Sequence, residues 1–185
     1  DCLAVGCDKA VVVDDAALEG AEPLAIAKAL AAALKRESHD LILFGIKAID
    51  DDASQVGVMT AELLGVPHVG YIGALELADG RLTARREIEG GVEVVESPLP
   101  CVLTCGKGLN EPRLPSLPNI MKAGMKPVEV VDCAALGIDA PSSHTTVKQY
   151  SPPPPRGEVT MIPADDPAAA ARELAQKLRD EAKVI

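Results

Sequence analysis

The chain has 185 residues, of which 48% are hydrophobic and 25% are charged, values typical of a globular protein with its own core. Acidic residues outnumber basic ones by 28 to 18, for a net charge of −10. This balance lacks the positive footprint of a nucleic-acid-binding protein, and the 2% of aromatic residues argues against stacking of single-stranded bases. No apolar run approaches the roughly 20 residues that span a bilayer, so neither a nucleic-acid partner nor membrane insertion is expected.

The five cysteines are odd in number and widely scattered: Cys2, Cys7, Cys101, Cys105 and Cys133. This distribution does not indicate a disulfide framework and favours a reducing compartment. Cys101 and Cys105 are four residues apart in a predicted strand and so share a face, where small buried hydrophobic side chains are favoured over redox or metal chemistry. No secretory signal peptide is visible. Asp1 runs straight into ordered-looking sequence, so we expect further residues to precede it.

The first half of the chain alternates between strand and helix patterns. The β-branched run 10–13 and the apolar run 41–44 predict buried strands. Between them, 24–35 is rich in Ala, Leu and Lys and follows Pro23, which predicts a helix. Strand, helix and strand with short connections form one βαβ unit, whose two strands are expected to be parallel. A further helix is predicted over 55–64, closed by Gly65.

The middle of the chain changes to a strand period. Two alternating runs flank Ala78-Asp-Gly80, a turn signal that predicts an antiparallel hairpin. The remaining predicted elements are strands at 92–96, 101–104 and 128–131, a long proline-rich loop at 106–118 and a short helix at 119–125. The fold class expected from these elements is α/β. It is a Rossmann-like, mostly parallel sheet with helices on both faces, an antiparallel hairpin excursion and a C-terminal arm.

The arm begins where the domain pattern weakens. We expect a nucleotide-binding α/β domain over 1–140 and an extended arm over 141–185. Four consecutive prolines at 152–155 form a stiff spacer, followed by a helix from Pro167 to about Lys183, capped by Asp165 and Asp166. Its apolar face consists of Ala171, Leu174, Ala175 and Leu178. Such a helix packs either on another chain, which is favoured here, or back on its own domain.

The candidate site is the segment from Gly45 to Gly57, which leaves a predicted strand and enters a predicted helix. Ligands bind at such positions in open α/β sheets. Three interpretations are open. The helix N–H groups and Lys47 hold a nucleotide phosphate, or the loop is only a capped connection, or the three carboxylates of residues 50–52 hold a metal ion. The chain has no phosphate-loop motif, nucleophile elbow or metalloprotease motif, so no catalytic site is expected.

Three motifs together resemble one family. Gly45-x-Lys-Ala-Ile-Asp-Asp-Asp-x-x-Gln-x-Gly57 resembles the nucleotide loop of the electron transfer flavoprotein β subunit. Arg86-Glu-Ile-Glu-Gly-Gly-x-Glu93 resembles the hairpin motif of that family. Leu109-Asn-Glu-Pro-Arg-x-x-Ser-Leu-Pro-Asn-Ile-Met-Lys-Ala123 resembles its signature and recognition loop. The match extends from about Leu3 to Asp139 without serious gaps, and the last motif is long and specific.

The resemblance implies an electron carrier rather than an enzyme. A partner α subunit carries most of the FAD site, and the pair relays electrons from dehydrogenases, such as acyl-CoA dehydrogenases, to a further acceptor. The β subunit holds a second nucleotide, AMP or a second FAD. By position, the nucleotide contacts are Gly45, Ile46, Lys47, Ala48, Ile49, Asp50, Asp51, Asp52, Ala53, Ser54, Gln55 and Val56.

Partner contacts are implied in two further places. Leu117 matches the anchor leucine that inserts into an acyl-CoA dehydrogenase, and its neighbours Pro118, Asn119, Ile120, Met121 and Lys122 belong to the same recognition segment. Glu87 matches the glutamate that engages the mobile FAD domain of the α subunit. The compartment implied is the bacterial cytoplasm, or the mitochondrial matrix in a eukaryote.

The chain departs from the common family pattern in two respects. Ala53, Ser54 and Val56 stand where the common members have a polar pair and a threonine, which is similar to the electron-bifurcating branch and favours FAD over AMP. The family's first strands, at least one βαβ unit of roughly 30 residues, have no counterpart here, so we expect this chain to be a fragment. An α/β nucleotide-binding regulatory module without a redox role is the alternative, but it does not account for the segment 109–125. An adenylyl-transferring hydrolase would need a Ser-Gly-Gly phosphate loop, which is absent.

Overall fold

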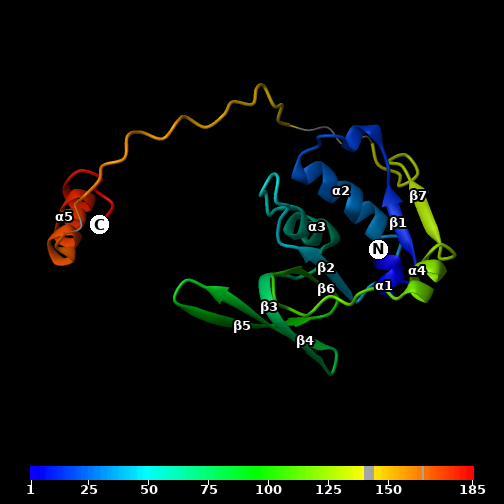
Figure 1. Ribbon diagram of the computed structural model, residues 1–185. Coiled ribbons are helices and arrows are strands. Elements are labelled where there is room, and N and C mark those ends of the chain that lie inside the picture. Colours follow the sequence, from blue (N-terminus) through cyan, green and yellow to red (C-terminus); the bar gives the residue numbers. More distant parts are fainter. Residues whose placement is uncertain (140–143, 164) are drawn as a thin grey trace. The chain divides into compact units, whose positions relative to one another are not determined.

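The computed structural model describes residues 1–139, 144–163 and 165–185, and the chain divides into two compact units (Figure 1). The first unit is Asp1–Thr146 and the second is Val147–Ile185. The first contains all the strands of the described residues, arranged in two sheets, together with most of the helices. The expected class is confirmed: the fold is α/β, with parallel pairing at its centre and an antiparallel hairpin attached.

The larger sheet has five strands in the order β2-β6-β3-β4-β5. Their bounds are Leu41–Gly45 (β2), Cys101–Cys105 (β6), His68–Ala78 (β3), Arg81–Ile88 (β4) and Gly91–Pro98 (β5). The pairs β2·β6 and β6·β3 are parallel, whereas β3·β4 and β4·β5 are antiparallel. The parallel strands β2, β6 and β3 therefore form one side of the sheet, and the antiparallel strands β4 and β5 extend the sheet on the other side.

The smaller sheet joins two distant segments, β1 (Ala10–Val13) and β7 (Val128–Val131), in parallel. The two strands of the predicted βαβ unit are not neighbours, because β1 hydrogen-bonds to β7 and β2 to β6. Contacts beyond the strands reinforce β1·β7: Asp14 N donates to Val131 O at 2.8 Å, and Asp15 Oδ2 accepts from Cys133 N at 3.0 Å. Asp15 also caps the short 3₁₀ helix Ala16–Leu18, which orients the chain as it leaves the strand.

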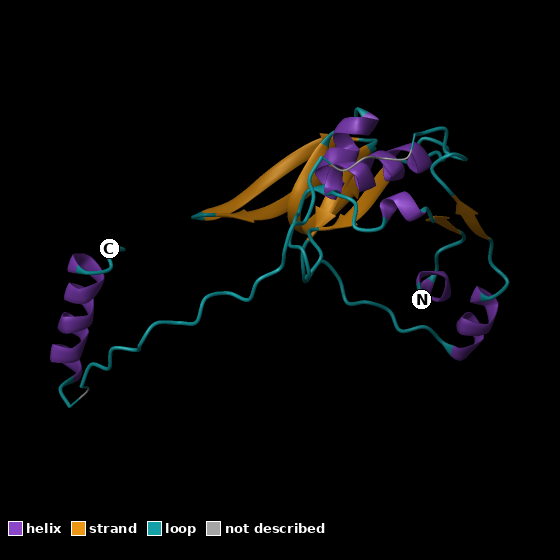
Figure 2. Ribbon diagram, turned by 90° about the horizontal axis from the view of Figure 1, so that it is seen from above, coloured by secondary structure: helices purple, strands orange, loops and turns teal. Residues whose placement is uncertain are grey.

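Two helices lie against one face of the larger sheet (Figures 1 and 2). Helix α2 (Pro23–Leu34) starts with proline in its first turn, where the missing N–H costs nothing. Helix α3 (Val56–Leu64) ends at Gly65, whose φ of 71° is the left-handed conformation that glycine adopts freely. Leu34 of α2 and Ala61 of α3 pack with Ile42 and Val102 of the sheet. Both predicted helices are confirmed.

The opposite face of the larger sheet carries a second buried cluster, formed by residues of β3, β4 and β6. The cluster consists of Val69, Ile72, Leu82, Ala84, Cys101 and Leu103. The hairpin turn is Asp79–Gly80, and both residues have positive φ, 50° and 72°, as in the type I′ turn that matches the strand twist. Burial raises the pKa of the Cys101 and Cys105 thiols, which agrees with their interpretation as small buried side chains.

The long loop after β6 is confirmed, and it leads to a short helix. Helix α4 (Leu117–Ala123) begins two residues earlier than predicted, because Pro118 is favourable in a first turn and Ser116 has the extended conformation of a cap. Helix α1 (Cys2–Val5) lies beside α4.

In the second unit, α5 (Pro167–Asp180) starts after Asp166, whose carboxylate accepts from the N–H groups of Ala168 and Ala169. The helix ends three residues earlier than predicted. Among the described residues, no helix is both long and apolar enough to cross a membrane.

Candidate functional site

Two long segments leave the same edge of the larger sheet. Strands β2 and β6 end in register at Gly45 and Cys105, and β3 adds Ile72 opposite Cys105. Gly106 N donates to Ile72 O at 2.8 Å, and a Cβ atom at Gly106 would lie 3.5 Å from Ile46 Cδ1. The β2–α3 loop and the β6–α4 loop therefore start side by side at the carboxyl ends of parallel strands, the usual ligand position of an open α/β sheet.

The β2–α3 loop is shaped largely by its own carboxylates. Asp50 Oδ1 accepts from Asp51 N at 3.0 Å, and Asp51 Oδ1 accepts from Ala53 N at 3.1 Å. Lys47 Nζ lies 2.5 Å from Asp52 Oδ1, and this hydrogen bond, with the charge of Asp52, raises the pKa of Lys47. The carboxylates thus hold the loop, and the charge of Lys47 is largely balanced by Asp52.

A metal-binding interpretation of the three aspartates finds no support in this geometry. Over 1–139, 144–163 and 165–185, the structure has no group of three or more His, Cys, Asp or Glu side chains that could hold a metal ion. Instead, each carboxylate accepts a bond from a neighbouring amide or pairs with the lysine.

The start of α3 offers backbone donors. Gln55 precedes the helix, and its side chain makes no capping hydrogen bond, so no side chain there competes for the first N–H groups of the helix. Those groups and the positive end of the helix dipole suit a phosphate. Gly45 adds space, since no atom lies within 4 Å of the position that its Cβ would take. The loop therefore fits the phosphate of a nucleotide held by backbone amides.

Gly57 has a different role from Gly45. A Cβ at Gly57 would lie 2.7 Å from Thr104 Cγ2 and 3.2 Å from Phe44 Cβ. Glycine is needed here because α3 approaches the sheet closely, so a substitution at Gly57 tests the packing of α3 rather than ligand contact.

Tyr71 is a residue of this edge that the sequence patterns did not single out. It is 53% exposed and has φ of 59°, a conformation that bulky side chains rarely adopt. A bulge between Val69 and Ala74 places it there, and Thr104 Oγ1 accepts from its N–H at 3.0 Å. The sequence does contain a signal for this position. Gly70 and Gly73 lie on either side of Tyr71, and glycines inside a strand often mark a bulge.

The predicted partner segment is exposed along its whole length. Helix α4 has no buried residue, and Leu117 is 72% exposed. The exposed set consists of the predicted Leu117, Pro118, Asn119, Ile120, Met121 and Lys122. Leu114 and Met125, 93% and 79% exposed, flank this set and were not predicted. An apolar set of this kind on a polar surface is typical of a protein-binding site.

Glu87 lies apart from that segment. It is exposed on β4, where it pairs in register with Val92 of β5. Figures 1 and 2 show the β4–β5 hairpin and α4 on different sides of the unit. The structure therefore presents two separate candidate partner surfaces.

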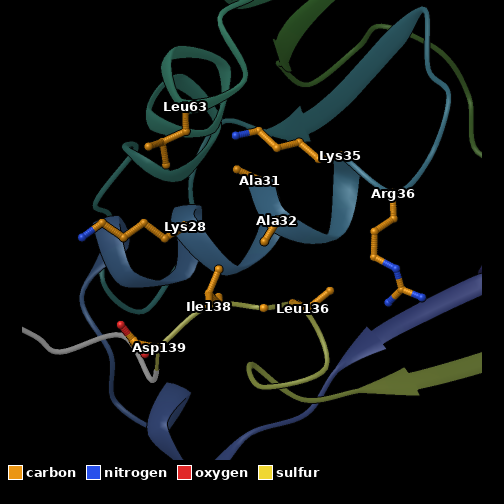
Figure 3. A pocket seen from close by; sticks show the side chains of 10 residues that line it. Lys28, Ala31, Ala32, Lys35, Arg36, Leu63, Leu136, Ile138 and Asp139 are labelled. Atoms are coloured by element: carbon orange, nitrogen blue, oxygen red, sulfur yellow. The ribbon is translucent and has the colours of Figure 1, made fainter.

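A cavity of about 760 Å³ lies elsewhere, beside α2 (Figure 3). Lys28, Lys35 and Arg36 line it together with Ala31, Ala32, Leu63 and residues 136–139. The three cationic groups point in different directions (Figure 3), and Arg36 is paired with Glu129 at 2.6 Å. The cavity thus offers no converging charge for an anion, and it does not include the predicted loop.

Comparisons with known proteins extend over nearly the whole chain. A family model described as the electron transfer flavoprotein domain matches residues 1–136. The electron transfer flavoprotein β subunit of Bacillus subtilis is 40% identical over 189 residues, which cover 99% of this chain and 72% of that protein. The pig (Sus scrofa) β subunit is 38% identical over 174 residues, 93% of this chain and 68% of that protein. Subunit CarD of the caffeyl-CoA reductase-Etf complex of Acetobacterium woodii is 36% identical over 187 residues, 98% of this chain and 71% of its own length.

Proposed function

Since the chain belongs to the electron transfer flavoprotein family, as a β subunit, we propose that it forms a heterodimer with an α subunit and relays electrons from a dehydrogenase to a further acceptor. The observation that carries this proposal is the similarity to β subunits over 93% and 99% of the chain. The chain has no catalytic site of its own in this proposal. FAD, bound mainly by the α subunit, supplies the electron-carrying chemistry. This chain binds the α subunit and a second nucleotide, and it offers a docking surface to the dehydrogenase.

The experiment that tests the relay combines the two subunits. The chain is co-expressed with an electron transfer flavoprotein α subunit, and flavin is quantified in the purified pair. An acyl-CoA dehydrogenase and its acyl-CoA substrate are then added, and bleaching of the bound flavin is followed by absorbance. Reduction that requires the dehydrogenase supports the relay. A pair that holds nucleotide but is never reduced would indicate a regulatory module instead.

The β2–α3 loop binds the adenylate portion that AMP and FAD share. Residues 45–56 would hold it, with backbone N–H groups at the start of α3 on the phosphate and Gly45 leaving room for close approach. Ala53, Ser54 and Val56, which resemble the bifurcating branch, favour a second FAD over AMP.

A matched pair of glycine variants tests this site. Gly45→Val fills the open space next to the proposed nucleotide, whereas Gly73→Val fills equally open space on β3. Nucleotides are released from each heterodimer by denaturation and separated by chromatography. We expect loss of the nucleotide in Gly45→Val alone, with FAD and AMP distinguished by their spectra and a second FAD giving about two flavins per pair. Unchanged nucleotide content in Gly45→Val would show that the β2–α3 loop does not bind the nucleotide.

Two surfaces serve the partners. The α4 segment, with Leu117 as anchor, docks on the dehydrogenase, and Glu87 on the hairpin engages the FAD domain of the α subunit. Both are exposed and lie on different elements, so both partners can be bound at once. The proposed compartment is the bacterial cytoplasm, or the mitochondrial matrix in a eukaryote.

The second unit docks on the α subunit. Its helix α5 has no buried residue, and its apolar stripe of Ala171, Leu174, Ala175 and Leu178 has the spacing of a helix that packs against another surface. Deleting 147–185 is expected to weaken the association constant of the two subunits, measured by calorimetry. An unchanged constant would mean that the arm packs on its own domain.

A further inference from the structure

Helix α4 is not stable by itself. It has seven residues, no buried side chain and no side-chain cap at Ser116, and an isolated helix shorter than about 12 residues is marginal in water. Its apolar residues are largely exposed, with Leu117 and Met121 72% and 71% exposed, so packing on α1 holds it only weakly. Interactions of residues beside the helix are therefore needed to fix its position more firmly.

Lys126 is such a residue at the C-terminal end. Its Nζ donates to Leu3 O at 2.9 Å and to Cys7 O at 2.5 Å. Both carbonyls belong to α1 or the turn that closes it, where backbone C=O groups lack helical partners and the helix dipole favours a cation. The Lys126 N–H donates to Ala123 O at 3.2 Å, so the backbone turn links the lysine directly to the last residue of α4.

The N-terminal side of the segment approaches the same turn. Gly6, which closes α1, has φ of 136°, and a Cβ at Gly6 would lie 3.3 Å from Arg113 Nη2. Between α4 and this turn, a cavity of about 120 Å³ is lined by Leu3, Ala4, Gly6, Asn119, Lys122 and Lys126. The segment 113–126 is thus bonded to the turn 3–7 through Lys126 at its C-terminal end, while Arg113 at its other end only lies near Gly6.

We propose that Lys126 is a positioning residue, which holds the partner-docking helix α4 on α1 and does not itself touch the partner. This inference rests on the proposed role of α4 in docking. Lys122 differs from Lys126 in its exposure. It is exposed on α4, where its charge can face a partner, whereas Lys126 is half-buried and directs its charge to two carbonyls.

The first experiment measures the attachment without any dehydrogenase. In the heterodimer, backbone hydrogen exchange is compared between wild type and Lys126→Met. The amides of 120–126 are expected to exchange about tenfold faster or more, since hydrogen bonds to a charged donor are lost, while amides of α2 and β6 are unchanged. Equal exchange at 120–126 would overturn the proposal.

The second experiment measures docking. The heterodimer is the varied substrate of an acyl-CoA dehydrogenase, and KM and kcat are obtained from flavin reduction. Lys126→Met is expected to raise KM about tenfold with kcat and flavin content retained, because the helix must be ordered at each encounter. Lys126→Arg, which keeps the cationic donor, should restore most of the KM. The control Lys107→Met removes the same charge from an exposed site and should leave KM within about twofold of wild type.

The outcomes separate the two proposals. Faster exchange at 120–126 with an unchanged KM would show that Lys126 holds α4 but that this order is not used in docking, which overturns the positioning role. If Leu117→Ala also leaves KM unchanged, the docking function of α4 itself fails. If Lys126→Met does not form the heterodimer, hydrogen exchange and KM are measured instead on Lys126→Gln, which keeps a neutral donor, and the same outcomes apply.

Discussion

The two segments that leave the edge of β2 and β6 start side by side but are held in different ways. The β2–α3 loop is short, bonded within itself and followed by a helix that packs tightly on the sheet. The segment 106–126 is long and almost fully exposed, and two side-chain hydrogen bonds of Lys126 hold its C-terminal end. The first arrangement suits the small ligand proposed for it, and the second suits the proposed protein partner. In these proposals, the tightly packed loop and the exposed segment of one sheet edge serve two kinds of recognition.

The largest effect is expected where the first segment meets the core. Gly57→Leu forces α3 away from Thr104 and Phe44, so we expect it to lower the free energy of unfolding by about 3 kcal/mol through overpacking. Calorimetric melting of the heterodimer should then show a drop of several degrees. The control Gly73→Leu extends into open space and should change little. Similar melting of the two variants would mean that α3 is not packed as closely as the structure has it.

The second segment should behave in the opposite way. Leu117→Ala removes an exposed side chain, so melting and flavin content should stay at the wild-type values. Loss of an anchor residue is expected to cost about 2 kcal/mol of binding, which is about 30-fold in KM for the dehydrogenase. Steady-state flavin reduction measures this. A clear loss of stability with normal kinetics per folded molecule would place Leu117 in a core.

A smaller effect is expected within the β2–α3 loop. Lys47→Met breaks the pair with Asp52, but both side chains are about half exposed or more, and such pairs contribute less than about 1 kcal/mol. If backbone amides hold the phosphate, Lys47→Met retains the nucleotide, measured after denaturation of the heterodimer. Release of the nucleotide would instead assign the phosphate contact to the lysine.

The smallest expected effect is a pH dependence of stability caused by His68, the first residue of β3. Burial, followed by the positive charge of Arg86, lowers the pKa of His68 from 6.5, and Arg86 is itself paired with Glu93. The Nε2 atom of His68 is buried without a hydrogen-bond partner in the described residues. Below about pH 6.5 the unfolded chain binds more protons at this residue than the folded chain, so stability falls as the pH drops from about 7 through the folded pKa. His68→Gln should flatten the melting temperature between about pH 7 and pH 5, and an equal slope in both proteins would exclude His68 as the cause.

Local features were predictable, and long-range pairing was not. Pro23, Gly65 and the pair Asp79–Gly80 each specify a helix start, a helix end or a turn by backbone preference alone, and the structure has all three. The pairing of β1 with β7 joins segments from opposite ends of the first unit, and two β-branched runs contain no information about which strand lies beside them. For that reason the partner of β1 could not be predicted from the sequence.

The candidate site shows the same division. Exposure of Leu117 follows from a proline-rich loop without periodicity, and this was visible in the sequence. The position of Tyr71 depends on a bulge and on the Thr104 hydroxyl, and the attachment of Lys126 depends on carbonyls at residues 3 and 7. Neither can be derived from local patterns, because each requires knowing which distant backbone lies nearby.

Thr104 is in contact with two parts of this edge at once, and this restricts how the protein can vary in evolution. Its methyl group occupies the space beside Gly57, and its hydroxyl accepts from the N–H of Tyr71. The change Gly57→Ala therefore requires a smaller side chain at position 104, besides a shift of a few tenths of an ångström at Phe44, yet the bulge at Tyr71 requires an oxygen at position 104. Thr104→Ser meets both requirements at position 104, so we expect alanine at position 57 to occur among relatives together with serine at position 104.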